Sequence, residues 1–487
     1  MTAPPGTLSD LRRDLDTGER SSVELVGAAL ARADELAESL NPFTELRPEA
    51  ARAEAAEADV RRRAGGALSD LDGLPMAIKG NMVQAGEPAT CASRILEAYI
   101  SPFTATAVQR LRDAGAVIVG RTNMDEFAMG SSTEHSIYGP TRNPWDTART
   151  AGGSSGGSAV AVAAGVVPAA LGSDTGGSIR QPASFCGVSG IKPTYGRVSR
   201  WGLVAFASSL DQIGAFARTA DDCAAVLEVI AGHDPRDSTS LPEAVPSYRE
   251  GFGDLSGVVI GLPVEYFVDD GVDAAVLDTV REAVALLERA GAKTREVSLP
   301  HTRYGIATYY LIADAEASSN LARYDGVRYG RRAEGTVGLT EMYERTRSEG
   351  FGDEVKLRIV LGTYVLSAGY YDAYYCKAQQ VRTLLRADFE RAFEGCDVIA
   401  TPTSPEIAFR VGEKTDDPLS MYLSDVYTVS ASLAGIPGIS IPCGFSEGMP
   451  VGLQLLGPAL DEATPLRVAD AFQRRTDHHA QRPGNGA

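Results

Sequence analysis

Short apolar runs alternate with helical patterns early in the chain, and this alternation constrains the fold more than any other feature of the sequence. Residues 74–78 (LPMAI) read as a short buried strand, residues 106–114 have the apolar spacing of a helix, and residues 116–119 (AVIV) read as the next strand. Strands that are separated by helices favour a sheet covered by helices. The sequence therefore predicts an α/β fold.

Further elements extend this pattern in both directions. The helices expected at the start of the chain span 8–15, 22–40 and 48–63. The later elements expected are strands at 258–261, 397–401 and 436–442 and a helix at 272–290. No internal repeat is visible, and a polar stretch at 232–253 is the one weak candidate for a domain boundary.

The composition limits what the chain binds. Its 487 residues carry 46 Lys and Arg against 64 Asp and Glu, a net charge of −18 that repels phosphate backbones. Direct, nonspecific nucleic-acid binding is therefore disfavoured, and we expect a partner to carry any RNA in the reaction. No apolar run is long enough to cross a membrane, and the six cysteines lack metal-site spacing, so we expect a cytoplasmic protein without a bound metal.

A first Gly/Ser-rich segment, residues 151–158 (AGGSSGGS), precedes an Ala-rich run. Such a segment suits a loop that enters a helix N-terminus, and its plainest interpretation is a capping turn. It also fits G-x-S-x-G, but the nucleophile elbow needs a strand before it, and residues 143–150 are polar and interrupted by proline. No lysine follows the glycines as a phosphate-binding loop requires, so both motifs are excluded.

A second such segment, residues 172–178 (GSDTGGS), can place a nucleophile beside an anion-binding nest. Successive amides of residues 175–178 can curl around an oxyanion while the hydroxyl of Ser178 stands next to them. The alternative is an ordinary Asp-Thr-Gly-Gly turn in which Ser178 caps a helix. The residues of this segment alone leave the two interpretations evenly balanced.

A serine nucleophile needs a base, and the usual base is histidine. The five histidines are His135, His233, His301, His478 and His479. Only the first lies in the Gly/Ser-rich region, so a lysine must be considered. Lys79 ends the apolar run 74–78, where we expect partial desolvation to lower its pKa toward the working range of a base. The alternative is a lysine that extends its amine to solvent.

Taken together, the segments 73–79 (GLPMAIK), 152–158 (GGSSGGS) and 172–182 (GSDTGGSIRQP) closely resemble the amidase signature family. The resemblance implies a single domain over 1–487, with a helical layer at 1–65, the signature core at 70–225 and the remainder at 254–480. It also implies a large, mixed, twisted β-sheet with helices on both faces.

The resemblance also implies the catalytic residues, which form a Ser-cisSer-Lys triad. Ser178 is then the nucleophile, Ser154 the bridging serine after a cis peptide bond, and Lys79 the base. The implied oxyanion hole consists of the backbone amides of Thr175, Gly176 and Gly177. One departure is Gly80, because the family commonly has an aspartate after the lysine, which puts the support of that carboxylate for Lys79 in doubt.

Later segments, including 350–356 (GFGDEVK) and 417–423 (DPLSMYL), resemble one subfamily, the A subunits of glutamine-dependent aspartyl/glutamyl-tRNA amidotransferases. This resemblance implies that glutamine is hydrolysed through an ester on Ser178. Arg358 is then expected to bind the α-carboxylate and Asp425 the α-ammonium, while Tyr309 and Ser131 line the pocket. Without the resemblance, Arg358 and Asp425 would be interpreted as surface charges.

The same resemblance implies a heterotrimer with B and C subunits. The B subunit is expected to bind tRNA and to hold ATP and magnesium, and no cofactor is expected on this chain. Ammonia from glutamine would convert Glu-tRNA(Gln), Asp-tRNA(Asn) or both. The alternatives are a stand-alone amidase that acts on another small amide and a non-catalytic structural subunit.

Overall fold

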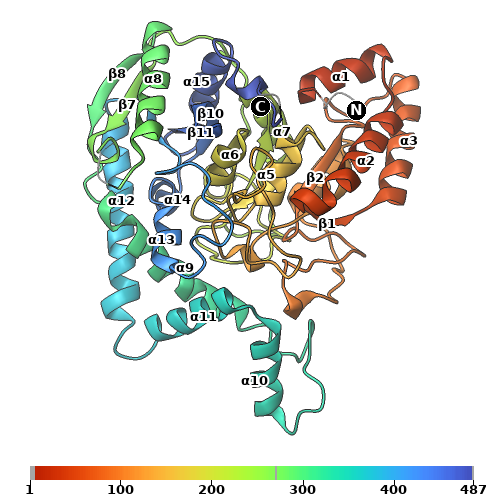
Figure 1. Ribbon diagram of the computed structural model, residues 1–487, viewed down its shortest axis with the longest axis vertical. Coiled ribbons are helices and arrows are strands. Elements are labelled where there is room, and N and C mark those ends of the chain that lie inside the picture. Colours follow the sequence, from red (N-terminus) through yellow and green to blue (C-terminus); the bar gives the residue numbers. More distant parts are fainter. Residues whose placement is uncertain (1–5, 269–270, 485–487) are drawn as a thin grey trace.

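The computed structural model describes residues 6–268 and 271–484, and within them eleven strands form one sheet (Figure 1). The strand order is β1-β3-β2-β4-β6-β5-β10-β11-β9-β7-β8. The strands are β1 (Phe43–Leu46), β2 (Pro75–Lys79), β3 (Val117–Thr122), β4 (Ala169–Asp174), β5 (Ser189–Lys192), β6 (Gln212–Ala217), β7 (Val259–Pro263), β8 (Lys293–Val297), β9 (Val398–Pro402), β10 (Gly438–Ser446) and β11 (Met449–Leu456).

The sheet is mixed, as expected. β2 runs parallel to β3 on one side and to β4 on the other, whereas β4 pairs antiparallel with β6. β10 and β11 form an antiparallel pair, and β7 runs parallel to β8 and β9. β2, β3 and β4 are buried along their whole length, which is typical of parallel strands covered on both faces.

Alternate residues of β2 enter two different hydrophobic cores. Met76 and Ile78 pack into the core that contains residues of α1, α4, α7, α8 and α15, whereas Ala77 packs into the core under α2, α3 and α5. Because side chains alternate across a strand, these two cores lie on opposite faces of the sheet. The prediction of a mixed sheet with helices on both faces is confirmed.

The helices of this part of the chain begin at recognisable signals. In α2, Ser21 and Glu24 form a reciprocal capping box, which fixes the start of the helix. The α3 helix begins with a proline at its first position. The bounds are α1 (Leu8–Thr17), α2 (Ser22–Leu40), α3 (Pro48–Arg63), α4 (Thr106–Asp113), α5 (Gly156–Ala163), α6 (Arg180–Cys186), α7 (Ala220–Ile230), α8 (Ala274–Arg289) and α15 (Ala463–Gln473).

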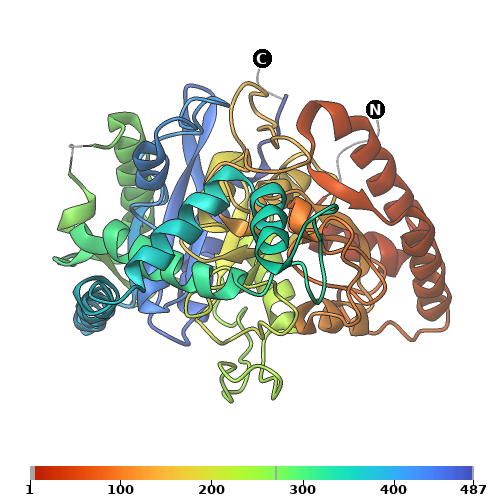
Figure 2. The same cartoon turned by 90° about the horizontal axis from the view of Figure 1, so that it is seen from below.

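A second group of helices covers the site region. In Figure 1, α10 and α11 extend below the body, and seen from below they lie across the middle of the molecule (Figure 2). The bounds are α9 (Gly305–Leu321), α10 (Leu339–Gly350), α11 (Asp353–Val365), the π-helical turn Asp372–Cys376, α12 (Lys377–Phe393), α13 (Pro418–Leu423) and α14 (Val429–Ala434). Among the described residues, no helix combines the length and the apolar character needed to span a membrane.

Candidate active site

Lys79 is the last residue of β2, and its side chain is fully buried at 0% exposure. Its Nζ donates hydrogen bonds to the hydroxyls of Ser154 at 2.7 Å, Ser155 at 2.8 Å and Ser173 at 3.0 Å. Burial lowers the pKa of Lys79 to about 7, because the charged form has lost its hydration. The sequence predicted partial desolvation, so the structure corrects the degree of burial and excludes an amine extended to solvent.

Ser154 lies in the loop before α5, and the peptide bond between Gly153 and Ser154 is cis. A Cβ on Gly153 would lie only 2.6 Å from the amide nitrogen of Ser132 and 2.8 Å from that of Thr133, so the close approach of these backbones requires glycine. Neither Ser154 nor Ser155 caps α5 with its side chain, because this helix has no side-chain cap. The hydroxyl of Ser155 instead donates to the carbonyl of Ser173. The capping-turn interpretation is therefore excluded.

Ser178 stands between β4 and α6, beside a loop with unused amides. The α6 helix has no side-chain cap, so the interpretation of Ser178 as a capping residue is excluded. Within residues 6–268 and 271–484, the amides of Thr175, Gly176 and Gly177 and the hydroxyl of Ser178 make no hydrogen bond. The residue is 7% exposed, unlike the fully buried Lys79 and Ser154. A hydroxyl next to three free donors suits attack on a carbonyl whose oxygen becomes an anion.

Three contacts hold this loop in place from outside the nest. The guanidinium of Arg180 donates to both carboxylate oxygens of Asp174 at 3.0 Å, and both side chains are fully buried. Thr175 Oγ1 donates to Asp211 at 2.7 Å, and Thr428 Oγ1 donates to the carbonyl of Gly176 at 2.6 Å. These bonds fix the orientation of the loop without using its amides.

The loops that carry the two serines contact one another. The amide of Gly153 donates to Oε1 of Gln181 at 3.0 Å, and Nε2 of the same Gln181 donates to the carbonyl of Ser131 at 2.8 Å. Gln181 thus links the Ser154 loop, the start of α6 after Ser178 and the segment that contains Ser131. Because Lys79 also donates to Ser154 and Ser173, the three signature segments of the sequence meet in one place.

Asp425 and Ser131 lie next to the nest. The hydroxyl of Ser131 donates to Oδ2 of Asp425, while Oδ1 of Asp425 is buried without a hydrogen-bond partner in the described part of the chain. A Cβ on Gly177 would lie 3.1 Å from that unpaired oxygen, which places it beside the loop that leads to Ser178. Burial raises the pKa of Asp425 to about 7. An ammonium group would donate a hydrogen bond to Oδ1 of Asp425 and would neutralise the buried carboxylate.

Tyr309 packs on the nest, and Arg358 lies near enough to Tyr309 and Asp425 to act on both electrostatically. A Cβ on Gly176 would lie 2.6 Å from Cζ of Tyr309, so the phenol ring packs directly on the nest. Arg358 on α11 is 2% exposed and forms an ion pair with Glu354 at 2.7 Å. Arg358 and Asp425 are both buried, which excludes the interpretation of this pair as surface charges.

Several residues of this region were not assigned from the sequence. The Ser155 and Ser173 hydroxyls share Lys79 Nζ with Ser154. Asp125 accepts the amides of Thr133 and His135 and supports the segment above Ser154. Ser155 and Ser173 stand inside the two Gly/Ser segments, so their position was a usable signal, whereas nothing in the sequence marks Asp125 as buried.

Gly80, the departure from the family pattern, is also explained in part. A Cβ there would lie 3.2 Å from the carbonyl oxygen of Thr122 and 3.5 Å from Sδ of Met124, which is tight. No carboxylate forms an ion pair with Lys79 among the described residues, and its Nζ is held by serine oxygens. The base in this chain thus depends on hydroxyls for its orientation.

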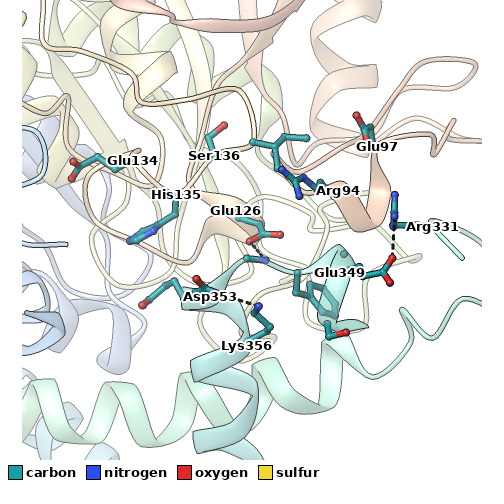
Figure 3. Close-up of a pocket in the computed structure, with 16 residues that line it drawn as sticks. Arg94, Glu97, Glu126, Glu134, His135, Ser136, Arg331, Glu349, Asp353 and Lys356 are labelled. Carbon is teal, nitrogen blue, oxygen red and sulfur yellow. Dashed lines mark hydrogen bonds and ion pairs between the residues drawn. The ribbon is translucent and has the colours of Figure 1, made fainter. Parts of the chain in front are cut away.

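A cavity of about 800 Å³ lies beside Glu126 and Glu354, and Ser178 is not among the residues that line it. Figure 3 shows Glu126, His135, Asp353 and Lys356 around it, with the first turn of α11 on one side. His135, the one histidine in the Gly/Ser-rich region, lines this cavity, and within the described part of the chain its ring forms no hydrogen bond with Ser154 or Ser178. It therefore offers no alternative base for Ser178.

The fold and site define a class of enzyme. Residues 24–466 match the family model described as Amidase, and the chain belongs to the amidase signature family. Among solved structures, the peptide amidase from Stenotrophomonas maltophilia is 32% identical with a TM-score of 0.82, over 98% of each chain.

Closer relatives share one particular description. The A subunit of the glutamyl-tRNA(Gln) amidotransferase from Chloroflexus aggregans is 58% identical over 98% of both chains, and its counterpart from Geobacillus kaustophilus is 57% identical over the same share. The crystal structure of the corresponding protein from Thermotoga maritima, which has the same description, is 43% identical, with a TM-score of 0.80, and covers 97% of this chain and 95% of that one.

Proposed function

We propose that this chain is the glutamine-hydrolysing subunit of a tRNA-dependent amidotransferase. The observation that carries the proposal is that two residues of opposite charge are buried in this region: Asp425 lies beside Gly177 of the nest, and Arg358 is near enough to act on Asp425 electrostatically. A free amino acid presents one carboxylate and one ammonium, which this pair matches, and a peptide amide lacks at least one of them. The full-length relatives described as amidotransferase subunits support the same choice.

The proposal assigns a catalytic role to each residue of this site. Neutral Lys79 accepts a proton from Ser154, which accepts one from Ser178 as its Oγ attacks the γ-amide carbon. The oxyanion receives hydrogen bonds from the amides of Thr175, Gly176 and Gly177. The relay then returns the proton to the departing nitrogen, which leaves as ammonia. A γ-glutamyl ester on Ser178 remains, and water hydrolyses it to glutamate.

The assembly belongs to the same proposal. Ammonia would pass to a B subunit that binds tRNA, ATP and magnesium, with a small C subunit completing a cytoplasmic heterotrimer. The product would be Gln-tRNA, Asn-tRNA or both. The net charge of −18 supports this division, because a chain this acidic leaves tRNA binding to a partner.

The deciding experiment compares the glutaminase activity of the isolated chain with that of the chain mixed with both partners and charged tRNA. We expect a strong preference for glutamine and a rise in its hydrolysis on assembly. Equal rates with and without partners, together with no preference for glutamine, would identify a stand-alone amidase instead.

A further inference from the structure

The guanidinium of Arg358 is enclosed by aromatic rings. Its Cζ lies 5.6 Å from the ring centre of Phe206, 5.1 Å from that of Tyr310 and 5.3 Å from that of Tyr422. The last two rings stack on each other at 3.8 Å. Because rings take up the space over the guanidinium, hydrogen-bond acceptors reach it along the edges of its plane.

Glu354, one helical turn before Arg358, occupies one of those edges. Arg358 Nε donates to Glu354 Oε1 at 2.7 Å, and Nη2 lies 2.7 Å from the same oxygen. The hydroxyl of Tyr422 donates to this oxygen as well, at 3.2 Å. Across the described ranges, Nη1 makes no hydrogen bond, so the edge away from Glu354 is the one left for a ligand.

The ion pair between Arg358 and Glu354 also affects the protonation of both side chains. Burial opposes the charge on Arg358, but Glu354, together with Tyr310, Asp314 and Tyr422, keeps the pKa of Arg358 well above its usual value. Burial likewise acts to raise the pKa of Glu354, but the charge and hydrogen bond of Arg358, together with His135 and Tyr422, bring the pKa of Glu354 below its usual value. The pair therefore stays ionised, and the arginine does not depend on substrate for a counter-charge.

We propose that Glu354 is a positioning residue that fixes the plane and the free edge of Arg358, and thereby sets the selection of amides that carry an α-carboxylate. This inference rests on the proposed function, because it needs Arg358 to bind that carboxylate. Glu354 itself does not touch the substrate. Its removal should therefore weaken binding through one substrate group and leave the chemical step intact.

Two analogues of glutamine separate these effects. Glutaramate keeps the carboxylate and lacks the ammonium, whereas 4-aminobutanamide keeps the ammonium and lacks the carboxylate. In the assembled enzyme, Glu354→Ala should raise the KM for glutamine and the inhibition constant of glutaramate about tenfold or more, with kcat changed less than about threefold. The inhibition constant of 4-aminobutanamide should not change. Glu354→Gln, which keeps an acceptor for Nε, should recover most of the affinity.

The matched control is Asp353→Ala. Asp353 precedes Glu354 on α11, its side chain is 98% exposed, and its ion pair with Lys356 lies at the surface. Like Glu354→Ala, this variant removes one negative charge from α11, but its KM for glutamine and its inhibition constants should equal those of the wild type. The proposal is overturned if Glu354→Ala leaves the glutamine KM unchanged, or if it weakens all three ligands equally, which indicates a general structural role. If the wild type itself does not discriminate glutamine from 4-aminobutanamide, the proposed function fails first.

Discussion

Two regions of the molecule meet at Ser178, and they are built in different ways. The catalytic segments, residues 79, 152–156 and 173–178, come from the ends of neighbouring strands β2 and β4 and the loop before α5. They are held by backbone contacts, glycines and serine hydroxyls. The second region, called the recognition helices here, consists of α9, α11, α13 and the turn before α14. These elements lie far apart in the sequence and contribute charged and aromatic side chains. We propose that the first region carries out the chemistry and that the second selects the substrate.

If this division is correct, the largest loss comes from the nucleophile. Ser178→Ala should reduce glutamine hydrolysis by about 10⁴-fold or more, because it removes the hydroxyl that we propose attacks the amide carbon. Glutamine binding, measured by calorimetry, should persist because Arg358 and Asp425 are intact. Ser39→Ala, at an exposed position on α2, serves as the control. Residual turnover near the wild-type rate would refute the assignment.

Substitution of Lys79 should have the next largest effect on kcat, and a second buried lysine provides a matched control. Lys79→Met should lower kcat by about 10³-fold, and Lys79→Arg should not restore it because a guanidinium stays protonated. The control is Lys192, which is also buried, with a pKa lowered by burial to about 7, but whose amine donates to the carbonyls of Pro193 and Ile436 rather than to serine hydroxyls. Lys192→Met should lower the melting temperature and retain kcat. Equal catalytic losses in both variants would mean that burial alone, not position, explains Lys79.

Changes in the recognition helices should act on binding instead. Arg358→Lys and Asp425→Asn should each raise the KM for glutamine on the order of 10–100-fold with a smaller change in kcat. A lysine cannot reproduce the fork that Glu354 orients, so the conservative change should not rescue binding. Steady-state kinetics decide this. A fall in kcat with an unchanged KM would place these residues in the chemistry and break the division.

The pH dependence combines one group from each region. Lys79 works only when neutral, so protonation below its pKa of about 7 stops the relay. Asp425 binds the ammonium only when charged, so protonation below its pKa of about 7 weakens glutamine binding. Both functions are lost as pH falls. On the acid side, kcat/KM for glutamine should change by up to about two powers of ten per pH unit, and for glutaramate by about one. Identical slopes would remove Asp425 from ammonium recognition.

The same division explains what the sequence could predict. The apolar run ending at Lys79 and the two Gly/Ser segments are continuous, so their residue types indicated a strand and tight turns. They left Ser178 evenly balanced between a nucleophile and a capping serine, and the resemblance of the three segments to a family decided for the nucleophile. The N-terminal helices were also predictable, because their caps and apolar spacing are local. The degree of burial of Lys79 was underestimated, because it depends on Ser155 and Ser173 and on how the loops close over the amine.

The recognition residues could not be predicted from local sequence patterns. Arg358 and Asp425 look like surface charges in an acidic chain, and only a family resemblance singled them out. Arg358 lies on α11, which packs closely against α9 at Gly362, where a Cβ would collide with the backbone carbonyl of Asp314. The role of Glu354 was invisible for the same reason, since it requires the aromatic rings of α9 and α13 around the guanidinium.

The most direct test of the central claim is to trap the intermediate. The assembled enzyme is mixed with glutamine, quenched in acid within the first turnover, digested, and its peptides are measured by mass spectrometry. A γ-glutamyl ester should appear on the peptide that contains Ser178, in Lys192→Met as in the wild type, and should be absent from Ser178→Ala. A glutamyl adduct on any other residue, or rapid turnover without an adduct on Ser178, would contradict the account.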